Sequence, residues 1–329
     1  MSSSEDDCVE MPPTKKARVV NVPAKIEMPH DDTNDESDDS FEKFEDYHPI
    51  EAIKNEPSTS SSRASSTMRT RPLTVQDVQG LEISFMSWNV DGLDRDHLKT
   101  RMRACAQIVK AVNPDIVFLQ EVVQHEIGPI DALRSLYDIH YAYPGAPYQT
   151  AILVSKFFQT VKHETVFFTN SGMHRCLQIL EGRIGDLPVF LMNTHLESMR
   201  DHSAQRSAQF KECMDKAQEL IDKNPGCMLF YGGDLNLRDK EVTSAFPEGV
   251  KDAWESAGKA QPTRYTWNMR LNDNHNKDGF NKAAMRFDRV YYYGPFNKVL
   301  FSLEGLRRIK TLDCFPSDHW AISAVFKAE

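Results

Sequence analysis

Short apolar runs separated by turn residues dominate the chain from residue 73 onward, and their length is typical of β-strands. The runs that predict strands are 81–90, 115–122, 151–154, 189–194, 228–231, 287–293 and 320–326. Apolar residues at three- or four-residue spacing predict helices over 97–112 and 202–223, each ended by an Asn-Pro pair. Several neighbouring strands have no helix between them, so the pattern favours an α/β fold with mixed or antiparallel sheets.

The first 72 residues have a different composition. They contain no glycine or tryptophan, only three aromatic residues, and two low-complexity stretches rich in Asp and Ser. Such a segment buries too little apolar surface to offset its chain entropy. We therefore predict a disordered tail over 1–72 and one folded domain over 73–329.

Charge is also concentrated in this tail. The whole chain has 39 Lys+Arg and 48 Asp+Glu, a net charge of −9, and the tail holds 16 acidic and nine basic residues, a net −7. The remaining net charge of −2 argues against a protein that coats nucleic acid through bulk charge, but it permits a local grip on a few phosphates. We expect neither a transmembrane helix nor an export signal, and we read the six scattered cysteines as reduced thiols.

Two short signals lie in the tail. The cluster Lys15-Lys16-Ala17-Arg18 is similar to a nuclear-import signal, and a chance cluster is the alternative. Lys54, in Ile-Lys-Asn-Glu, is placed like an acceptor for a ubiquitin-like modifier, although four-residue matches also arise by chance. We expect the protein in the nucleus and also in the cytoplasm.

Polar residues of catalytic type follow five of the apolar runs or, in one case, precede one. They are Asn89 and Asp91, Glu121, His195, Asp234 and Asn236, and Asp318 and His319. Any one of them is readily explained as a surface turn, but turns explain five such sites poorly. Carboxylates suit Mg²⁺ and a general base, while His and Asn donate hydrogen bonds to developing negative charge, so the set favours metal-assisted phosphoryl transfer. We read Gly232-Gly233 as a tight turn that aims Asp234.

The motifs resemble those of the endonuclease/exonuclease/phosphatase superfamily over roughly residues 80–329. In order, they are SWNVDG (87–92), LQEV (119–122), NTHLES (193–198), GDLNLR (233–238) and PSDHW (316–320). WNVDGLD (88–94), YTW (265–267) and RFDR (286–289) are most similar to the metal-dependent 5′-tyrosyl-DNA phosphodiesterases. That resemblance implies a four-layer α/β sandwich of two mixed β-sheets flanked by helices.

The resemblance also implies roles. Glu121 would bind Mg²⁺ (or Mn²⁺) directly, and Asp91 directly or through water, while Asp234 would be the general base. His195, Asn236 and His319 would donate to the phosphate, Asp318 would orient its surroundings, and Asn89 would orient the metal shell or the phosphate. The implied contacts with the DNA 5′ end are Asn89, Gly92, Leu93, Tyr148, His195, Ser198, Arg200, Asn236, Arg238, Trp267 and Phe287. Core packing is the alternative for Trp267 and Phe287, and Asp288 would either support catalysis or pair with Arg286 or Arg289.

The implied activity is release of a trapped topoisomerase II tyrosine from a DNA 5′-phosphate by water. Expected partners are single-stranded or overhanging DNA ends carrying a 5′-linked tyrosine or peptide, and 5′-tyrosyl RNA, with no membrane and with a monomeric protein. Relatives can carry a ubiquitin-binding helical domain, which the tail does not resemble, so contact with ubiquitin stays open. Two alternatives also stay open, namely another nuclease or phosphatase of the superfamily and an inactive binding module.

Overall fold

The computed structural model describes residues 71–242 and 246–329, so the expectations for the tail, including the import cluster and Lys54, lie outside the described residues. Within these ranges the strands are β1 (Glu82–Asn89), β2 (Ile116–Val123), β3 (Tyr137–Tyr141), β4 (Tyr148–Ser155), β5 (Phe158–Phe167), β6 (Cys176–Ile184), β7 (Leu187–His195), β8 (Met228–Asp234), β9 (Lys251–Asp252), β10 (Trp267–Asn268), β11 (Ala284–Met285), β12 (Asp288–Tyr293), β13 (Lys298–Glu304) and β14 (Ala321–Lys327). The helices are α1 (Leu98–Val112), α2 (Gly128–Asp131), α3 (Ser203–Lys223) and α4 (Ala253–Ser256), with 3₁₀ turns at Val75–Val78, Gln124–Glu126, Ala132–Ser135, Arg200–His202, Asp239–Glu241 and Gln261–Thr263.

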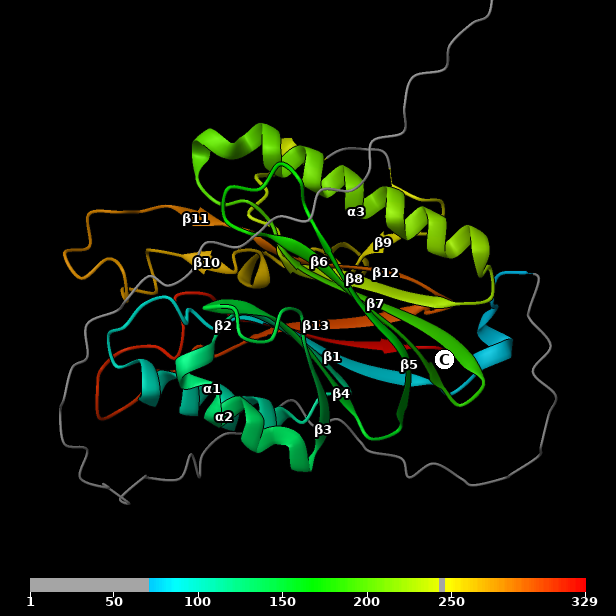
Figure 1. The fold of residues 1–329 in the computed structure, drawn as a ribbon, viewed down its shortest axis with the longest axis horizontal. Coiled ribbons are helices and arrows are strands. Elements are labelled where there is room, and N and C mark those ends of the chain that lie inside the picture. The colour runs from blue at the N-terminus through cyan, green and yellow to red at the C-terminus, as the bar shows by residue number, and fades with distance from the viewer. Residues whose placement is uncertain (1–70, 243–245) are drawn as a thin grey trace, which may run out of the picture. The chain divides into compact units, whose positions relative to one another are not determined.

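Two six-stranded sheets form the centre of the domain. Their strand orders are β13-β14-β1-β2-β4-β3 and β5-β6-β7-β8-β12-β9, and β10 and β11 form a separate hairpin. Helices α1 and α2 lie over the outer face of the first sheet and α3 over the outer face of the second (Figure 1). The predicted four-layer sandwich of two mixed sheets is therefore confirmed.

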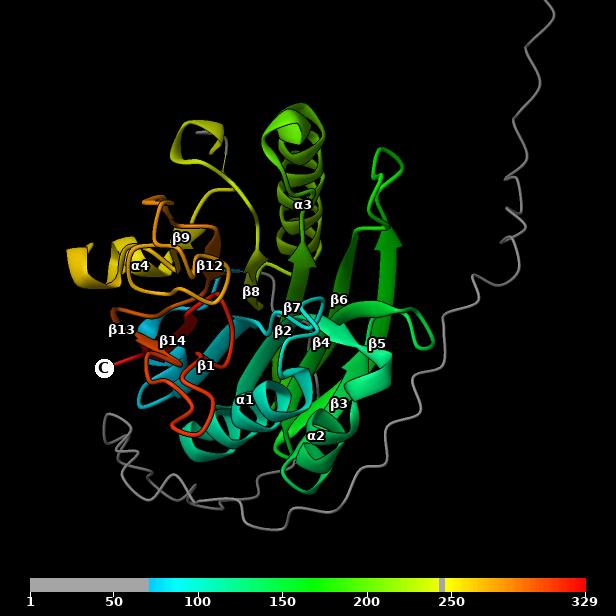
Figure 2. The same cartoon turned by 90° about the vertical axis from the view of Figure 1, so that its left-hand side faces the viewer.

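Each sheet contains one parallel pair of strands joined by a helix. β1 pairs with β2 through α1, and β7 pairs with β8 through α3, whereas the other strand pairs in both sheets are antiparallel. In Figure 1 the chain enters β1 from the right, beside the C-terminus, and runs toward the β10–β11 hairpin at the left. Because the carboxyl ends of parallel strands meet at one edge of a sheet, both pairs deliver their final residues to this end, which faces the viewer in Figure 2.

Aromatic side chains fill the space between the sheets. Phe85, Phe118, Phe230 and Phe326 are buried there, and Phe85 packs on Phe118 with ring centroids 4.8 Å apart. A second cluster, around Phe210 of α3, packs that helix onto the outer face of its sheet. Burial of each such ring stabilises the fold by about 1.5–3 kcal/mol, so the packing holds the strand ends in fixed positions.

The observed elements agree closely with those expected for α1 and α3. α1 ends where Asn113 adopts a left-handed conformation (φ 48°) and its N–H bonds the carbonyl of Val109, directly before Pro114. The predicted tight turn at Gly232-Gly233 is wrong, because β8 continues through both residues to Asp234. A Cβ at Gly233 would lie 1.9 Å from the Thr194 carbonyl oxygen, so glycine is needed there for the close approach of β7. In the described ranges no helix is long and apolar enough to cross a membrane.

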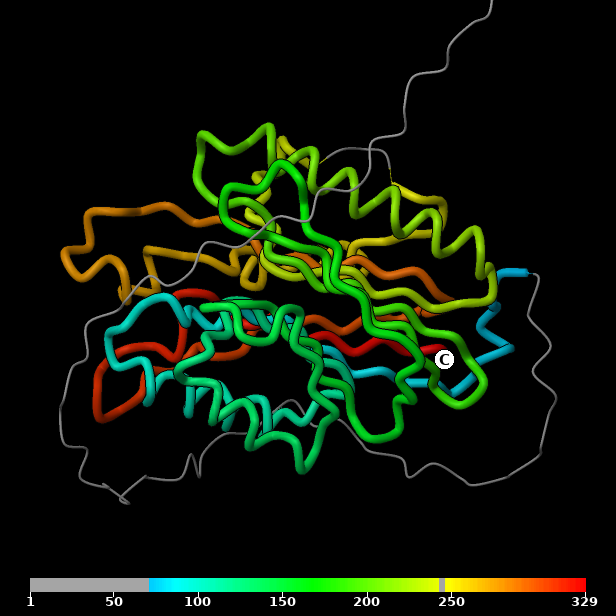
Figure 3. Tube along the Cα trace, viewed as in Figure 1, coloured from blue at the N-terminus to red at the C-terminus, as the bar shows by residue number. Residues whose placement is uncertain are grey.

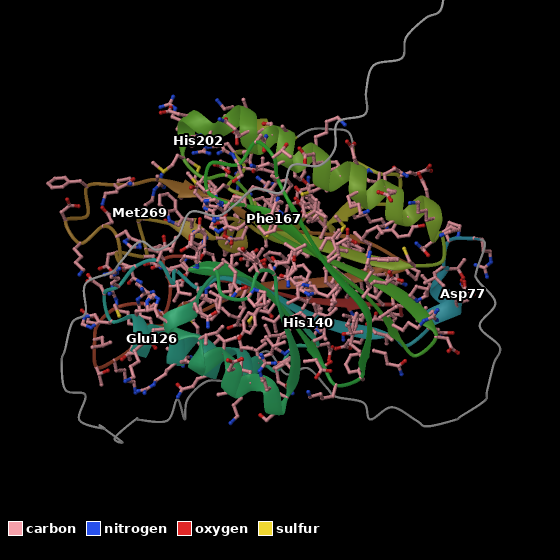
Figure 4. All side chains as sticks on the ribbon, in the orientation of Figure 1. Asp77, Glu126, His140, Phe167, His202 and Met269 are labelled. Atoms are coloured by element: carbon pink, nitrogen blue, oxygen red, sulfur yellow. The ribbon has the colours of Figure 1, made fainter. Side chains whose placement is uncertain are left out.

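A histidine pair joins the free edges of the two sheets. The rings of His140 on β3, labelled in Figure 4, and His163 on β5 have centroids 5.5 Å apart. The amide nitrogen of Gln178 donates to the His140 carbonyl (2.7 Å) and lies 3.0 Å from Nε2 of His163, while its oxygen accepts from Thr150. Nε2 of His163 is therefore an acceptor, which requires a neutral ring.

We expect the fold to lose stability as this pair becomes protonated. Partial burial lowers the pKa of both His140 and His163 below the ordinary value, so the unfolded chain binds protons more readily than the fold. The contribution is intact above the unfolded pKa of about 6.5 and is lost as pH falls through the lower folded values. His163→Gln should therefore flatten the fall of the melting temperature between pH 7 and pH 5.5, whereas His125→Gln, at an exposed position, should not. Equal slopes in the two variants would contradict this.

Candidate active site

The candidate site lies where the two parallel pairs end, and Figure 3 traces the chain through this end. β1 ends at Asn89, β7 at His195 and β8 at Asp234. β2 carries Glu121 at an irregularity in its pairing with β4, where the register shifts between Leu119 and Val122. Glu121 has φ 57°, and a bulge of this kind redirects a side chain out of the regular alternation of a strand.

Asp234 lies at the centre of the site and is buried. Its Oδ1 accepts from the backbone N–H of Asn236, and its Oδ2 accepts from Nδ2 of Asn89, both at 3.0 Å. Nε2 of His195 and Nε2 of His319 lie 3.3 and 3.7 Å from the same Oδ2. Although burial opposes ionisation, these surrounding donors keep the pKa of Asp234 below its ordinary value. The carboxylate is thus ionised at neutral pH and able to orient a water molecule.

His195 is fixed in one tautomer by Arg175. A guanidinium nitrogen of Arg175 lies 2.7 Å from Nδ1 of His195, and guanidinium can only donate, so the ring proton is on Nε2. Burial, and then the charge of Arg175, hold the pKa of His195 well below its ordinary range. His195 is therefore a neutral donor whose Nε2–H points toward Asp234.

His319, in contrast to His195, is positively charged. Its Nδ1 lies 2.8 Å from Oδ2 of the fully buried Asp288, whose backbone N–H bonds Thr266. Burial lowers the pKa of His319, but the carboxylates of Asp288, Asp318 and Asp234 outweigh it and raise the pKa well above the ordinary value. The site therefore offers one neutral and one cationic imidazole to an anionic substrate.

The structure shows which side chain pairs with Asp288. Arg286 pairs with Asp252 (2.5 Å) and Arg289 pairs with Asp239 (2.7 Å), so neither arginine is the partner of Asp288. Asp288 instead contacts Nδ1 of His319, a contact that would orient the imidazole.

Asp91, Glu121 and Asp318 form an acidic cluster beside Asp234. Burial, and then the charges of Asp318 and Asp91, raise the pKa of Glu121 to about 7. Burial is also the main cause that raises the pKa of Asp318 to about 6, with Asp91 adding to it. The raised pKa values show that the negative charges of these carboxylates repel one another, and a bound divalent cation would relieve that repulsion. The oxygen donors therefore fit the expected metal. A ligand role suits Asp318 as well as the orienting role we expected.

Arg101 holds Asp91 of the acidic cluster in place through hydrogen bonds. This buried side chain donates to Oδ2 and to the backbone oxygen of Asp91, at 3.3 and 3.1 Å. Asp91 has φ 53°, and its N–H bonds Oδ1 of Asn89 at 2.9 Å. A Cβ at Gly92 would lie 2.1 Å from the backbone oxygen of Glu121, so only glycine lets the segments that carry Asp91 and Glu121 approach so closely.

His275, which we read from the sequence as a surface or satisfied histidine, is exposed at the surface and also contacts the acidic cluster. Its Nε2 lies 3.2 Å from Oδ2 of Asp91 and 3.9 Å from Oδ2 of Asp318. The contact with Asp91 is the main cause that raises the pKa of His275 to about 9. The residue belongs to a loop between β10 and β11 that has no periodic pattern, so nothing in the sequence around it marked it.

Aromatic residues line one side of the site. Trp267 and Phe287 have ring centroids 5.4 Å apart, and the guanidinium of Arg238 lies 5.5 Å from the Phe287 ring. Nε1 of Trp267 donates to Oδ2 of Asp318 at 3.0 Å. Phe287 is buried, whereas Trp267 is partly exposed, so the core alternative suits Phe287 and the groove prediction suits Trp267.

The other residues predicted to contact DNA lie around the same end. Tyr148 donates its hydroxyl to the Met173 carbonyl (2.6 Å) and lies beside Arg175. Ser198 is partly buried, with Oγ 3.1 Å from the Met173 sulfur. Leu93 and Arg200 are exposed at the surface. The location of these residues is compatible with contact to DNA but does not test it, so the DNA contacts stay predictions.

We expect Trp267→Ala to weaken binding of single-stranded ends. Loss of one stacked base costs about 1–3 kcal/mol, so the Michaelis constant on an oligonucleotide should rise roughly 5- to 150-fold. A substrate without bases should be much less affected. Trp267→Phe keeps an aromatic face but removes the donor to Asp318, which makes it the matched control, and it should retain most of the binding. A large loss of melting temperature with equal effects on all substrates would instead make Trp267 a core residue.

Comparisons with known proteins agree with this geometry. The model of the Endonuclease/Exonuclease/phosphatase family matches residues 86–319. A 5′-tyrosyl-DNA phosphodiesterase from Caenorhabditis briggsae is 60% identical over 266 residues, 80% of this chain and 75% of that protein. A crystal structure of TDP2 from Caenorhabditis elegans is 60% identical, with TM-score 0.75, covering 78% of this chain and 77% of that one. A structure of D. rerio TDP2 complexed with single strand DNA product is 30% identical, with TM-score 0.69, covering 75% of this chain and 99% of that one.

Proposed function

Because the chain belongs to the endonuclease/exonuclease/phosphatase family and to its 5′-tyrosyl-DNA phosphodiesterase branch, we propose that it hydrolyses the bond between a protein tyrosine and the 5′-phosphate of a DNA strand. The observation that carries the chemistry is the buried Asp234 carboxylate, held by Asn89 and Asn236 between two imidazoles and beside an acidic cluster. The choice of substrate rests on the relatives named for that activity.

In this proposal Asp234 accepts the proton of the attacking water. The water oxygen bonds to phosphorus, the bond from phosphorus to the tyrosine oxygen breaks, and the phenolate then takes a proton from solvent. Tyrosine leaves readily because its phenol has a pKa near 10. His195 and His319 donate hydrogen bonds to the phosphate oxygens as negative charge develops on them.

The family depends on divalent metal ions. The acidic cluster supplies residues that would hold one, and ligand atoms of its Asp91 and Asp318 lie within 4.8 Å of each other. Asp91, Glu121 and Asp318 would bind Mg²⁺, with Mn²⁺ able to replace it. Such an ion neutralises charge on the phosphate oxygens when bound.

A single assay tests both the substrate and the reaction. The protein is incubated with a 5′-phosphotyrosyl oligonucleotide, an abasic duplex and a phosphoinositide, each with Mg²⁺ and with EDTA. We expect cleavage of the first substrate only, with no activity in EDTA. In ¹⁸O-water the label should enter the DNA 5′-phosphate and not the tyrosine. Preference for either other substrate would overturn the proposal.

Two finer points extend this proposal. The physiological substrate is a topoisomerase II tyrosine trapped on a DNA 5′ end. The hydrolysis takes place in the nucleus. Lys15-Lys16-Ala17-Arg18 supports the nuclear location. Deletion of residues 1–70 should reduce nuclear accumulation and leave turnover on short oligonucleotides nearly unchanged. Unaltered accumulation would retire the import signal.

A further inference from the structure

The loop between β10 and β11 brings a histidine to a carboxylate that is 184 positions away in the chain. Nε2 of His275 lies 3.3 and 3.2 Å from the two carboxylate oxygens of Asp91. One ligand atom each of Asp91, His275 and Asp318 can be chosen so that all three lie within 4.8 Å of one another. No motif of the metal site includes His275.

The contacts of His275 with Asp91 lie at the long end of the range for hydrogen bonds. Charge-assisted N–H···O bonds are usually about 2.7–2.9 Å long, and Nε2 of His275 is farther than that from both oxygens of Asp91. Two ligands that share a metal at about 2.0–2.1 Å lie roughly 3.0–3.4 Å apart when adjacent and about 4 Å apart when opposite. The contact of 3.2 Å with Asp91 and that of 3.9 Å with Asp318 fall in these two ranges.

The loop is fixed to the segment that carries Asp318. Nδ2 of the buried Asn272 donates to the Ser317 carbonyl at 2.8 Å. Asn274 exchanges two hydrogen bonds with the backbone of Phe315, at 3.0 and 2.9 Å. His275 is therefore held in place relative to Asp318, and ligands that are already in position lose little entropy on binding.

We propose that His275 is a ligand of the divalent cation held by Asp91 and Asp318. An all-oxygen site suits Mg²⁺, whereas an imidazole ligand adds affinity for transition ions such as Mn²⁺ and Co²⁺. This chain would therefore bind Mn²⁺ and Co²⁺ more tightly, relative to Mg²⁺, than the oxygen ligands alone allow. The inference concerns the metal site of the proposed function but does not depend on the identity of the substrate.

The test measures metal binding by the full chain without any substrate. Calorimetric titration with MnCl₂, CoCl₂ and MgCl₂ compares the wild type, His275→Gln and, as a control, the exposed His125→Gln. We expect His275→Gln to weaken Mn²⁺ and Co²⁺ at least tenfold, on the order of losses seen on disturbing metal sites, and to weaken Mg²⁺ much less. Electron spin-echo spectra of bound Mn²⁺ should show ¹⁴N modulation in the wild type and in His125→Gln, and none in His275→Gln.

The spectra separate a ligand from a residue that only positions Asp91, because a positioning role gives no nitrogen coupling. Persistent ¹⁴N modulation in His275→Gln would assign the nitrogen to another histidine and overturn the proposal. Unchanged Mn²⁺ affinity in a folded His275→Gln protein, checked by its melting temperature, would also overturn it. Cleavage of the tyrosyl oligonucleotide is measured separately, so a failure of the proposed function leaves the metal result standing.

Discussion

Asp234→Asn is expected to lower the turnover number on a 5′-tyrosyl oligonucleotide by about two to four orders of magnitude, the usual contribution of a general base. The Michaelis constant should change little, because the imidazole donors and the acidic cluster remain. Steady-state kinetics on one oligonucleotide, with the turnover number and Michaelis constant resolved separately, checks both statements.

The same substitution should also reduce stability. Asp234 accepts from Asn236 on one oxygen and from Asn89 on the other, and an amide has only one oxygen to offer. One buried donor is therefore left without an acceptor, which costs about 1–3 kcal/mol in the free energy of unfolding. Asp138→Asn, on the exposed side of β3, is the matched control and should alter neither quantity. Near-normal turnover in Asp234→Asn would show that Asp234 is not the general base.

Asp288→Asn is expected to lower turnover by about two to four orders of magnitude, although Asp288 acts on the substrate only through His319. An orienting carboxylate of this kind, replaced by its amide, cost about 10⁴ in a serine protease, where the imidazole was left in the wrong tautomer. The Michaelis constant should change much less than the turnover number, because a group that acts in the transition state is lost.

Comparison of Asp288→Ala with Asp288→Asn separates the effect of Asp288 on the orientation of His319 from its effect on the stability of the fold. Asp288→Ala leaves the His319 imidazolium buried without its nearest counter-charge, and breaking a buried pair destabilises by about 3–5 kcal/mol. We therefore expect thermal melting to place Ala well below Asn in stability, while both have low turnover. Equal turnover in the wild type and Asp288→Asn would show that the contact is only structural.

Periodicity predicted an α/β fold with mixed or antiparallel sheets and the strand ends that meet in the site, because a buried strand that stops at a polar residue leaves a clear mark in the sequence. The four layers were implied by the family resemblance. Strand β5 left no such mark, since most of its side chains are exposed at the sheet edge. Arg175, Asp288 and His275 were missed or left open for a different reason. Their partners are 20, 31 and 184 positions away, and only the packing of two sheets and a loop brings them together.

Asp91, Glu121 and Asn236 all hold left-handed backbone conformations, with φ between 51° and 57°. Each such residue stores about 1 kcal/mol or more that glycine would not, so glycine at any of these positions relaxes the backbone while removing a functional side chain. At these three residues a substitution that raises the free energy of unfolding therefore lowers turnover. A directed-evolution campaign that selected only for heat tolerance would drift toward inactive proteins, and it must hold these codons fixed to improve the enzyme.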